Sequence, residues 1–297
     1  MSRTAADGLV VVDKPAGFTS HDVVAVLRGI ARTRRVGHAG TLDPMATGVL
    51  VVGIGRATRL LGHLALTEKE YEGTIRLGRT TVTDDAEGEI TGGSGARDVP
   101  RTALDAEVAR LTGDIMQVPA KVSAVKIDGK RSYHRVRAGE DVEIPARPVT
   151  VRSFTVRETR ERHADDGTPV LDVDVTVVCS SGTYIRALAR DLGAALGTGG
   201  HLTALRRTRV GPYELAVAHP LEELRETLTV LPLGEAAAAA FPRWDVDERQ
   251  AALLGNGARI TTPALPAGPV AVFGPEDRFI ALIEAAGERS RSLAVFG

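Results

Sequence analysis

The sequence predicts a mixed α+β fold with a small β-rich module at the C-terminal end. Its composition is that of a folded globular protein, with 43% hydrophobic and 25% charged residues among 297. Segments that alternate apolar and polar residues are interspersed with segments of helical spacing, and the sequence has no repeat of roughly 20–50 residues. Short strand-like segments separated by Gly and Pro follow residue 242. We therefore expect one large mixed domain and one small domain.

The first elements are a strand and a helix. Residues 9–12 form an apolar run that ends in a turn containing Pro15 and Gly17. A helix then begins with Ser20 as its cap. Its apolar side consists of Val23, Val24, Leu27 and Ile30. A glycine-punctuated loop follows, and the β-branched segment 49–54 predicts a buried strand.

The middle of the chain alternates strands with helices. Residues 71–77 alternate with period two and predict a strand, whereas the acidic, glycine-rich segment 82–97 predicts a loop. A helix opens at Pro100. Residues 170–178 predict a half-buried strand, and an amphipathic helix with Arg186 in its first turn follows directly.

A change of composition near residue 240 predicts the domain boundary. The stretch 228–241 includes five consecutive alanines and carries little pattern. We expect residues 1–236 to form the first domain and residues 241–297 the second. One short helix at 246–254 and several short strands in the second domain fit a small β-barrel.

Several classes of protein are excluded. The single cysteine, Cys179, rules out an intramolecular disulfide and a Cys-rich metal site, and it fits a reducing compartment. The longest apolar run, 48–54, is far shorter than the roughly 20 residues of a membrane helix, and residues 1–8 do not resemble a signal peptide. Phosphate-binding glycine loops and metal-binding histidine pairs are also missing. We expect a cytoplasmic protein that needs no metal, nucleotide or membrane.

Two short motifs suggest enzymes but have structural explanations. The tripeptide Ser20-His21-Asp22 is contiguous at a helix start, so its side chains cannot converge as a hydrolase triad does. Asp172 and Asp174 match the start of an aspartate-nucleophile phosphatase motif, but the apolar strand continues past them and no later acidic pair is available for magnesium. We interpret both aspartates as the wet face of a strand.

Basic residues are concentrated although the net charge is −1. Residues 118–137 carry six cations and one acid, an excess of five, and the Asp-Gly pair at 128–129 predicts a hairpin that projects as a finger. Two further basic clusters consist of Arg28, Arg32, Arg34 and Arg35, and of Arg206, Arg207 and Arg209. Each alone is typical of a solvated surface, but together they would bind phosphates.

The block Gly37–Gly48 holds the strongest candidate for chemistry. Asp43 precedes Pro44, which keeps the aspartate extended, and apolar Leu42 and Met45 flank it. The glycines allow a ligand to approach the backbone closely. An aspartate before proline is usually a turn former, but these surroundings favour a fixed and partly dry carboxylate.

At these residues the sequence resembles the bacterial TruB-type tRNA pseudouridine synthases, which isomerise uridine 55 in the T loop. The similar segments occur in the family's order at 12–24, 37–48, 69–71, 123–130, 181–186 and 205–207. The resemblance implies a mixed, largely antiparallel sheet of the pseudouridine synthase type. Residues 241–297 are similar to the PUA-type RNA-binding module that such enzymes carry.

The resemblance also implies roles for individual residues. Asp43 matches the catalytic nucleophile, which attacks either the uracil ring or ribose C1′, and the sequence leaves both open. Arg186 matches the arginine that pairs with this aspartate, and Tyr71 matches the ring that stacks on the flipped uracil. The remaining matches to substrate-binding residues are His38, which contacts the displaced nucleotide, and Tyr184 and Leu205, which line the uracil pocket.

The partner implied by the resemblance is the T-arm stem-loop of tRNA, bound by a monomer without guide RNA or cofactor. The finger, about 118–147, matches a segment that closes over the RNA. Candidate RNA-backbone contacts are Lys126, Lys130, Arg131, Arg206 and Arg207. The segment Val118-Pro119-Ala120 departs from the family, because a second proline and a frequent aromatic residue are absent.

Two rival functions stay open at this point. A guide-RNA-dependent synthase shares the aspartate block but not the long basic finger. A non-catalytic RNA-binding or RNA-folding protein would have no need for Asp43, so the presence of Asp43, Tyr71 and Arg186 together favours an enzyme that could also fold its RNA.

Overall fold

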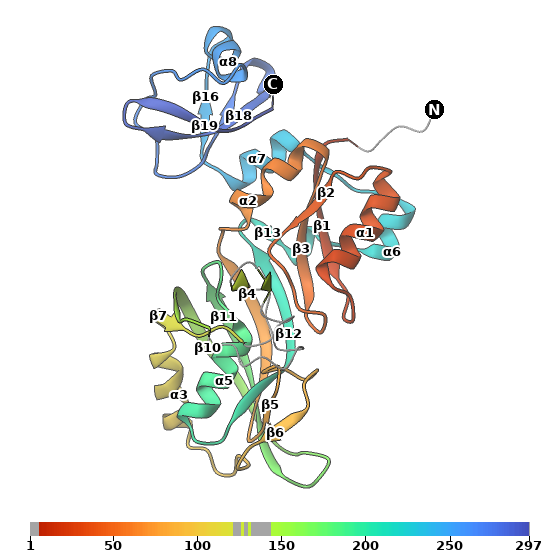
Figure 1. Ribbon diagram of the computed structural model, residues 1–297, viewed down its shortest axis with the longest axis vertical. Coiled ribbons are helices and arrows are strands. Elements are labelled where there is room, and N and C mark those ends of the chain that lie inside the picture. Colours follow the sequence, from red (N-terminus) through yellow and green to blue (C-terminus); the bar gives the residue numbers. More distant parts are fainter. Residues whose placement is uncertain (1–5, 121–125, 128–129, 132–143, 297) are drawn as a thin grey trace. The chain divides into compact units, whose positions relative to one another are not determined.

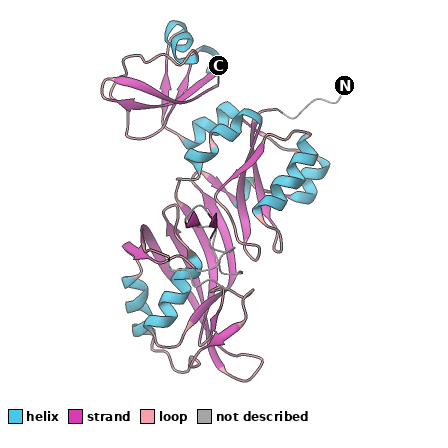
Figure 2. Cartoon of the chain, in the orientation of Figure 1, coloured by secondary structure: helices cyan, strands magenta, loops and turns pink. Residues whose placement is uncertain are grey.

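The computed structural model describes residues 6–120, 126–127, 130–131 and 144–296 (Figure 1). Their helices and strands form two units (Figure 2). Unit 1 comprises Met1–Pro44, Gly48–Thr67 and Val210–Gly297, and unit 2 comprises Met45–Thr47 and Glu68–Arg209. The predicted boundary between residues 236 and 241 differs from this division and stays a prediction.

The N-terminal strands of unit 1 pair around β1 and β3. β1 (Gly8–Lys14) runs antiparallel to β3 (Thr47–Ile54), and β3 also pairs with β2 (Val36–Ala39). β14 (His219–Pro220) and β15 (Leu231–Pro232) pair with β1. The predicted strands at 9–12 and 49–54 are thereby confirmed.

Helices cover both sides of these strands (Figure 1). α1 (Ser20–Ala31) and α6 (Leu221–Glu226) lie side by side, and α2 (Leu61–Leu64) and α7 (Leu233–Ala240) lie on the opposite side. Short connecting elements are η1 (Gly55–Arg59), β13 (Tyr213–Glu214) and η2 (Leu215–Val217). Among the described residues, no helix is both long and apolar enough to cross a membrane.

The start of α1 differs from the prediction in one residue. Thr19, not Ser20, is the cap: its hydroxyl accepts a hydrogen bond from the Asp22 N–H, and the Asp22 carboxylate accepts one from the Thr19 N–H at 2.8 Å. This reciprocal pair satisfies two otherwise unpaired donors of the first turn. Ser20 is consequently released from capping and turns into the protein.

The C-terminal module, expected as a small β-rich domain, is built on a four-stranded sheet. The strand order is β16 (Arg243–Asp245), β17 (Val270–Phe273), β18 (Phe279–Ala286) and β19 (Arg289–Val295). α8 (Glu248–Gly255) covers it, and η3 (Pro275–Asp277) joins β17 to β18. The predicted short helix at 246–254 is therefore confirmed to within two residues.

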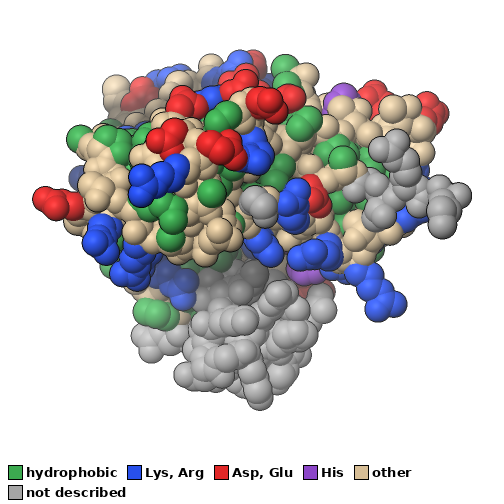
Figure 3. Space-filling view, turned by 90° about the horizontal axis from the view of Figure 1, so that it is seen from above, with side chains coloured by type: hydrophobic (Ala, Val, Ile, Leu, Met, Phe, Trp, Pro, Cys, Tyr) green, Lys and Arg blue, Asp and Glu red, His purple; other side chains and the backbone are tan. Residues whose placement is uncertain are grey.

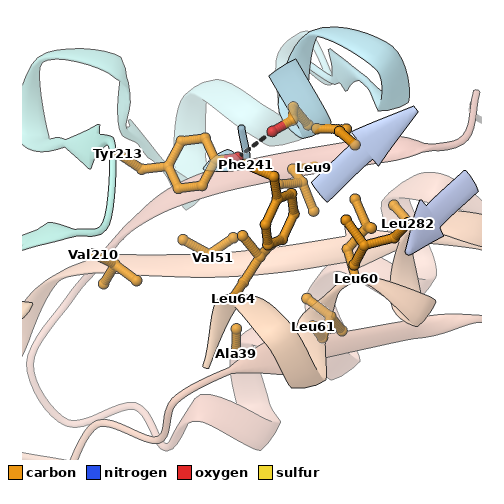
Figure 4. Close-up of a cluster of buried hydrophobic side chains, with 14 of the residues drawn as sticks. Leu9, Ala39, Val51, Leu60, Leu61, Leu64, Val210, Tyr213, Phe241 and Leu282 are labelled. Carbon is orange, nitrogen blue, oxygen red and sulfur yellow. Dashed lines mark hydrogen bonds between the residues drawn. The ribbon is translucent and has the colours of Figure 1, made fainter. Parts of the chain in front are cut away.

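The module shares a hydrophobic core with the rest of unit 1 (Figure 4). Phe241 and Leu282 lie in one cluster with Leu9, Val51 and Leu64. In this cluster the Tyr213 hydroxyl donates to the Ala236 carbonyl at 2.9 Å. Such a shared core means that the module is held by burial of apolar surface as well as by its linker.

The strands of unit 2 follow the order β12-β4-β11-β10-β7, and the registers of β4, β11, β10 and β7 are antiparallel. Their bounds are Gly200–Val210, Lys69–Leu77, Pro169–Cys179, Arg147–His163 and Gly113–Gln117. The helices α3 (Arg101–Arg110) and α5 (Ile185–Ala195) pack against the sheet and against each other. The predicted strands at 71–77 and 170–178, the helix opening at Pro100 and the helix of Arg186 are confirmed.

Two short hairpins complete unit 2. β5 (Thr80–Thr81) pairs with β6 (Ile90–Gly92), so the predicted loop 82–97 contains one strand. β8 (Lys126–Ile127) pairs with β9 (Lys130–Arg131), which confirms the predicted hairpin. The rest of the finger between 121 and 143 lies outside the described residues.

The polar face of the unit 2 sheet explains Asp172 and Asp174. Asp172 accepts two hydrogen bonds from Arg76, and Asp174 accepts hydrogen bonds from Thr74 and Arg160. Cross-strand pairs of opposite charge stabilise a sheet. The strand interpretation of these two aspartates therefore holds, although Asp172 is 7% exposed and so does not face water as expected. The phosphatase interpretation has no support.

Candidate active site

The Asp43 loop is fixed by its backbone on the N-terminal side. Ser20 is 1% exposed, and its hydroxyl oxygen accepts a hydrogen bond from the Leu42 N–H at 2.9 Å. The same hydroxyl lies 3.3 Å from the Leu42 carbonyl, to which it donates. A buried serine that pairs with both backbone groups of one residue anchors that residue. Leu42 is the neighbour of half-buried Asp43.

The loop is also fixed on the C-terminal side of Asp43. The Lys14 ammonium donates to three backbone carbonyls, those of Pro15, Phe18 and Pro44, at 2.8, 2.6 and 3.2 Å. The Gly17 N–H donates to the same Pro44 carbonyl at 2.9 Å. Three acceptors match the three donors of an ammonium, which explains how Lys14 can be 0% exposed. Asp43 is therefore carried on a backbone that is held at both neighbours.

The residues of the Ser20-His21-Asp22 tripeptide have three separate tasks. Ser20 holds Leu42 and Asp22 caps α1, as described above. The ring of His21 packs edge-on against His38 of β2, with ring centroids 5.4 Å apart. His38 thus lies in the same unit as Asp43. Its contact with His21 was not predicted from the sequence. The exclusion of a hydrolase triad is confirmed.

Arg186 in unit 2 is a buried side chain. It is 5% exposed, donates to the Thr83 carbonyl at 2.9 Å and lies 3.4 Å from the Asp85 carboxylate. Asp85 is 2% exposed and also accepts hydrogen bonds from the Thr83 hydroxyl and, at 3.1 Å, the Glu87 N–H. A buried cation needs such a partner, because burial alone disfavours its charge.

A second ion pair lies beside the first. Arg190, one turn after Arg186 on α5, lies 3.3 Å from the Asp84 carboxylate. Burial raises the pKa of Asp84 above its usual value, and Arg190 opposes this. Sequence analysis missed both acidic partners. The available signal was two adjacent acids together with two arginines four residues apart on one helix.

Leu205 lines a cavity of about 630 Å³ in unit 2. Gly73, Arg206, Met45 and Thr47 also contribute to its walls. The Arg206 guanidinium donates to the Thr47 hydroxyl at 3.2 Å. Thr47 follows Asp43 by four residues in the chain. At Gly73 a Cβ atom would approach the Ala204 carbonyl to 3.1 Å, so glycine lets the two strands lie close there.

Tyr71 and Tyr184 belong to the same unit as Leu205 and Arg186. Tyr71 is 7% exposed and lies on the buried face of β4. Tyr184 is half-buried and directly precedes α5. Unit 2 therefore holds Tyr71, Tyr184, Arg186 and Leu205, whereas unit 1 holds His38 and Asp43. The pairing of Asp43 with Arg186 and the stacking role of Tyr71 stay predictions.

The expectation that Arg207 contacts RNA is not compatible with its position. Its side chain is 1% exposed, so the guanidinium is not available to a phosphate on the surface. Arg206 is only half-buried and keeps that assignment. Lys126, Lys130 and Arg131 lie in β8 and β9, and their side chains lie outside the described part of the structure.

Cys179 is a structural thiol. It is 1% exposed, and burial raises its pKa to about 11. Since the thiolate is the reactive form, a thiol with so high a pKa is a poor nucleophile near neutral pH. Its surroundings therefore indicate a structural role.

Three family models match consecutive parts of the chain. The model described as "TruB family pseudouridylate synthase (N terminal domain)" matches residues 28–185. "tRNA pseudouridylate synthase B C-terminal domain" matches residues 186–233. "tRNA Pseudouridine synthase II, C terminal" matches residues 241–297.

Similar proteins and structures agree with these models. A protein from Streptomyces griseus called tRNA pseudouridine synthase B is 71% identical over 99% of this chain and 98% of its own length. One from Thermobifida fusca with the same name is 60% identical over 98% of this chain and 99% of its own length. A chain in the solved structure of an H/ACA RNP bound to a substrate RNA containing 2′-deoxyuridine has a TM-score of 0.73 and 25% identity, over 98% of this chain and 85% of that chain.

These matches confirm the predicted α+β class as well as the predicted resemblance. They cover the segment of Asp43, the helix of Arg186 and the C-terminal sheet. Because one family model spans more than half of the chain and the relatives match it almost from end to end, the chain belongs to the TruB family of pseudouridylate synthases.

Proposed function

We propose that this isomerase converts uridine 55 in the T loop of tRNA to pseudouridine, with Asp43 as the nucleophile and without a cofactor. The observation that carries the proposal is the fixed backbone on both sides of Asp43, in a chain 71% identical to a protein called tRNA pseudouridine synthase B. Preorganised placement of a nucleophile lowers the entropic part of the barrier. A carboxylate can form and release a covalent adduct unaided.

The reaction rearranges bonds within one nucleotide. The bond between N1 of uracil and ribose C1′ breaks, and a bond between C5 and C1′ forms. C5 loses its proton and N1 takes up a proton, so that the product is an isomer of uridine. Asp43 attacks either the uracil ring or C1′, and both routes stay open. In this proposal Arg186 keeps the Asp43 carboxylate ionised and oriented, and Tyr71 stacks on the detached base.

The base must leave its stack before it can react. Extrusion costs a few kcal/mol, and contacts inside the pocket and along the phosphates offset this cost. The cavity beside Leu205 is large enough to take part of a nucleotide. Lys126, Lys130, Arg131 and Arg206 are the proposed phosphate contacts. On the face in Figure 3, basic and acidic side chains are interspersed, so phosphate binding depends on local clusters rather than on net charge.

The decisive experiment uses a T-arm stem-loop that carries tritium at C5 of the target uridine. Purified wild-type protein should release tritium without guide RNA, metal or nucleotide. Asp43→Asn should release none, because an amide is not a nucleophile, and its affinity for the stem-loop should stay within about twofold of wild type.

Asp22→Asn is the matched control, because it makes the same chemical change at the exposed cap of α1. It should turn over at nearly the wild-type rate. Turnover by Asp43→Asn would remove the nucleophile assignment. Turnover that needs a guide RNA would favour a guided synthase, a rival for which the likeness to a chain of an H/ACA RNP is the supporting observation.

A further inference from the structure

Tyr184 occupies a position at which an aromatic residue is unfavourable. It is the cap residue of α5, with φ −100° and ψ 108°, and its side chain caps no backbone N–H. Ser, Thr, Asp and Asn are preferred there, and other residues cost about 1 kcal/mol. Positions that break a local rule are often functional ones. Something other than local sequence must therefore hold the backbone of Tyr184.

Gln117 at the end of β7 supplies that support. Its amide oxygen accepts a hydrogen bond from the Tyr184 N–H at 2.8 Å, and its amide nitrogen donates to the Tyr184 carbonyl at 3.1 Å. The Gln117 side chain is 1% exposed, whereas Tyr184 is half-buried. A primary amide carries one acceptor and one donor group, which match the two backbone groups of a single residue.

A third bond ties the same end of β7 to α5. The Arg190 guanidinium donates to the Val118 carbonyl at 2.8 Å, one residue after Gln117. The start of α5 is thus attached to the end of β7 at Tyr184 and again at Arg190, six residues further along. Between these two points lies Arg186, which is held by Thr83 and Asp85.

We propose that Gln117 is a positioning residue for the reaction. By fixing both backbone groups of Tyr184, it sets the direction in which the Tyr184 side chain leaves the chain and the place where the helix of Arg186 begins. Gln117 does not itself touch the substrate. The inference rests on the proposed function, in which Tyr184 lines the uracil pocket and Arg186 orients Asp43.

The first test removes both hydrogen bonds while it keeps the length of the side chain. In Gln117→Met, the single-turnover rate on the tritiated stem-loop should fall about tenfold or more. The Tyr184 N–H loses this acceptor, and the Tyr184 carbonyl loses this donor but keeps its bond from the Leu188 N–H, so the backbone of Tyr184 relaxes. The affinity for the stem-loop should change by less than about threefold, because no phosphate contact is altered. Equal losses of rate and affinity, or an unchanged rate, would overturn the proposal.

The second test restores the bonds by pH. In Gln117→Glu, an ionised carboxylate can accept from the Tyr184 N–H but cannot donate to the Tyr184 carbonyl, whereas a protonated carboxyl does both. Burial favours the protonated form. The rate of Gln117→Glu relative to wild type should therefore rise as the pH falls from about 8 to about 6, while the ratio for Gln117→Met stays flat. Parallel profiles for the two variants would contradict the proposal.

The chain's other glutamine provides the matched control. Gln250 accepts a hydrogen bond from the Asp247 N–H in the cap of α8. Gln250→Met removes a capping bond and should leave the single-turnover rate unchanged even if it lowers the melting temperature. If Gln117→Met does not fold, the pH profile of Gln117→Glu decides. A wild-type protein without any tritium release would refute the proposed function and not this inference.

Discussion

Each unit buries a cation at its part of the predicted site, but the two cations have different partners. In unit 1, Lys14 is 0% exposed, and its ammonium donates to three backbone carbonyls, including that of Pro44. In unit 2, Arg186 is 5% exposed and lies 3.4 Å from the carboxylate of Asp85. Lys14 thus contacts three backbone carbonyls, whereas Arg186 contacts a carboxylate and one carbonyl.

The difference corresponds to what each cation holds in place. Three carbonyls from different points of the chain accept hydrogen bonds from Lys14. The ammonium thereby joins the turn after β1 to Pro44 and fixes the loop of Asp43. Arg186 is itself the group that must keep one direction, and Asp85 with its own hydrogen bonds supplies that direction. Backbone support and side-chain orientation are thus separate tasks in the two units.

The largest effect is expected from breaking the charged pair. Asp85→Ala leaves the Arg186 guanidinium buried without this carboxylate, which should lower the free energy of unfolding by about 3–5 kcal/mol. The single-turnover rate should fall as well, because the guanidinium loses its fixed direction. Urea unfolding and tritium release measure the two quantities.

The neighbouring acid is the control for this variant. Asp84 pairs with the partly exposed Arg190, whose side chain is 26% exposed. Asp84→Ala should therefore cost at most about 1 kcal/mol. If the two alanine variants were equally stable, the contrast between a buried pair and a partly exposed one would be lost.

A smaller effect is expected from removing the ammonium of unit 1. Lys14→Met keeps most of the apolar stem but leaves the three carbonyls without this donor, which should lower the free energy of unfolding by about 3 kcal/mol. The rate should fall because Pro44 loses an anchor, while the pair of Arg186 and Asp85 stays intact. Urea unfolding and single-turnover rates again provide the measurement.

Arg28→Met is the control for Lys14→Met. Arg28 is exposed and donates to one carbonyl, that of Val36, at 3.3 Å. Its loss should change the free energy of unfolding by about 0.5 kcal/mol or less. If Lys14→Met lowered the free energy of unfolding by a similarly small amount, the three hydrogen bonds of the buried ammonium would contribute no more to stability than one hydrogen bond at the surface.

The elements that sequence predicted are those that depend on local pattern. The period of two at 71–77 and the helical spacing after Tyr184 survive in the structure because each is a property of neighbouring residues. The Asp43 block was recognisable because its residues are contiguous. Ser20 shows the limit: a serine at a helix start predicts a cap, but Thr19 with Asp22 is a complete capping pair, and Ser20 binds Leu42 instead.

The contacts that sequence did not predict join distant residues. Gln117 and Tyr184 are 67 positions apart, and Arg186 is separated from the Thr83 carbonyl by 103. No local period relates such pairs, and each was decided by how strands and helices pack. The prediction that Arg207 contacts RNA has the same weakness, since neither the residue type nor its neighbours reveal that the side chain is buried in β12.

Another buried cation of unit 2 sharpens the contrast further. Lys69 of β4 is 5% exposed and lies close to Arg207. Burial, together with the nearby Arg207 charge, lowers the pKa of Lys69 to about 8. The surroundings of Lys69 thus disfavour its charge. We expect this to appear as a dependence of the free energy of unfolding on pH.

The sign of that dependence follows from proton counts. Between pH about 8 and about 10.4, the unfolded chain keeps a proton on Lys69 that the folded protein has released, so stability rises with pH by about 1 kcal/mol from pH 8 to pH 9. Cys179 acts oppositely, because its raised pKa makes the folded protein keep a proton that the unfolded chain loses. Comparing wild type with Lys69→Met, in which Cys179 is retained, isolates the lysine: the difference in unfolding free energy should move by about 1 kcal/mol toward wild type over that interval. A constant difference would mean that Lys69 keeps its charge in the folded protein across this pH range.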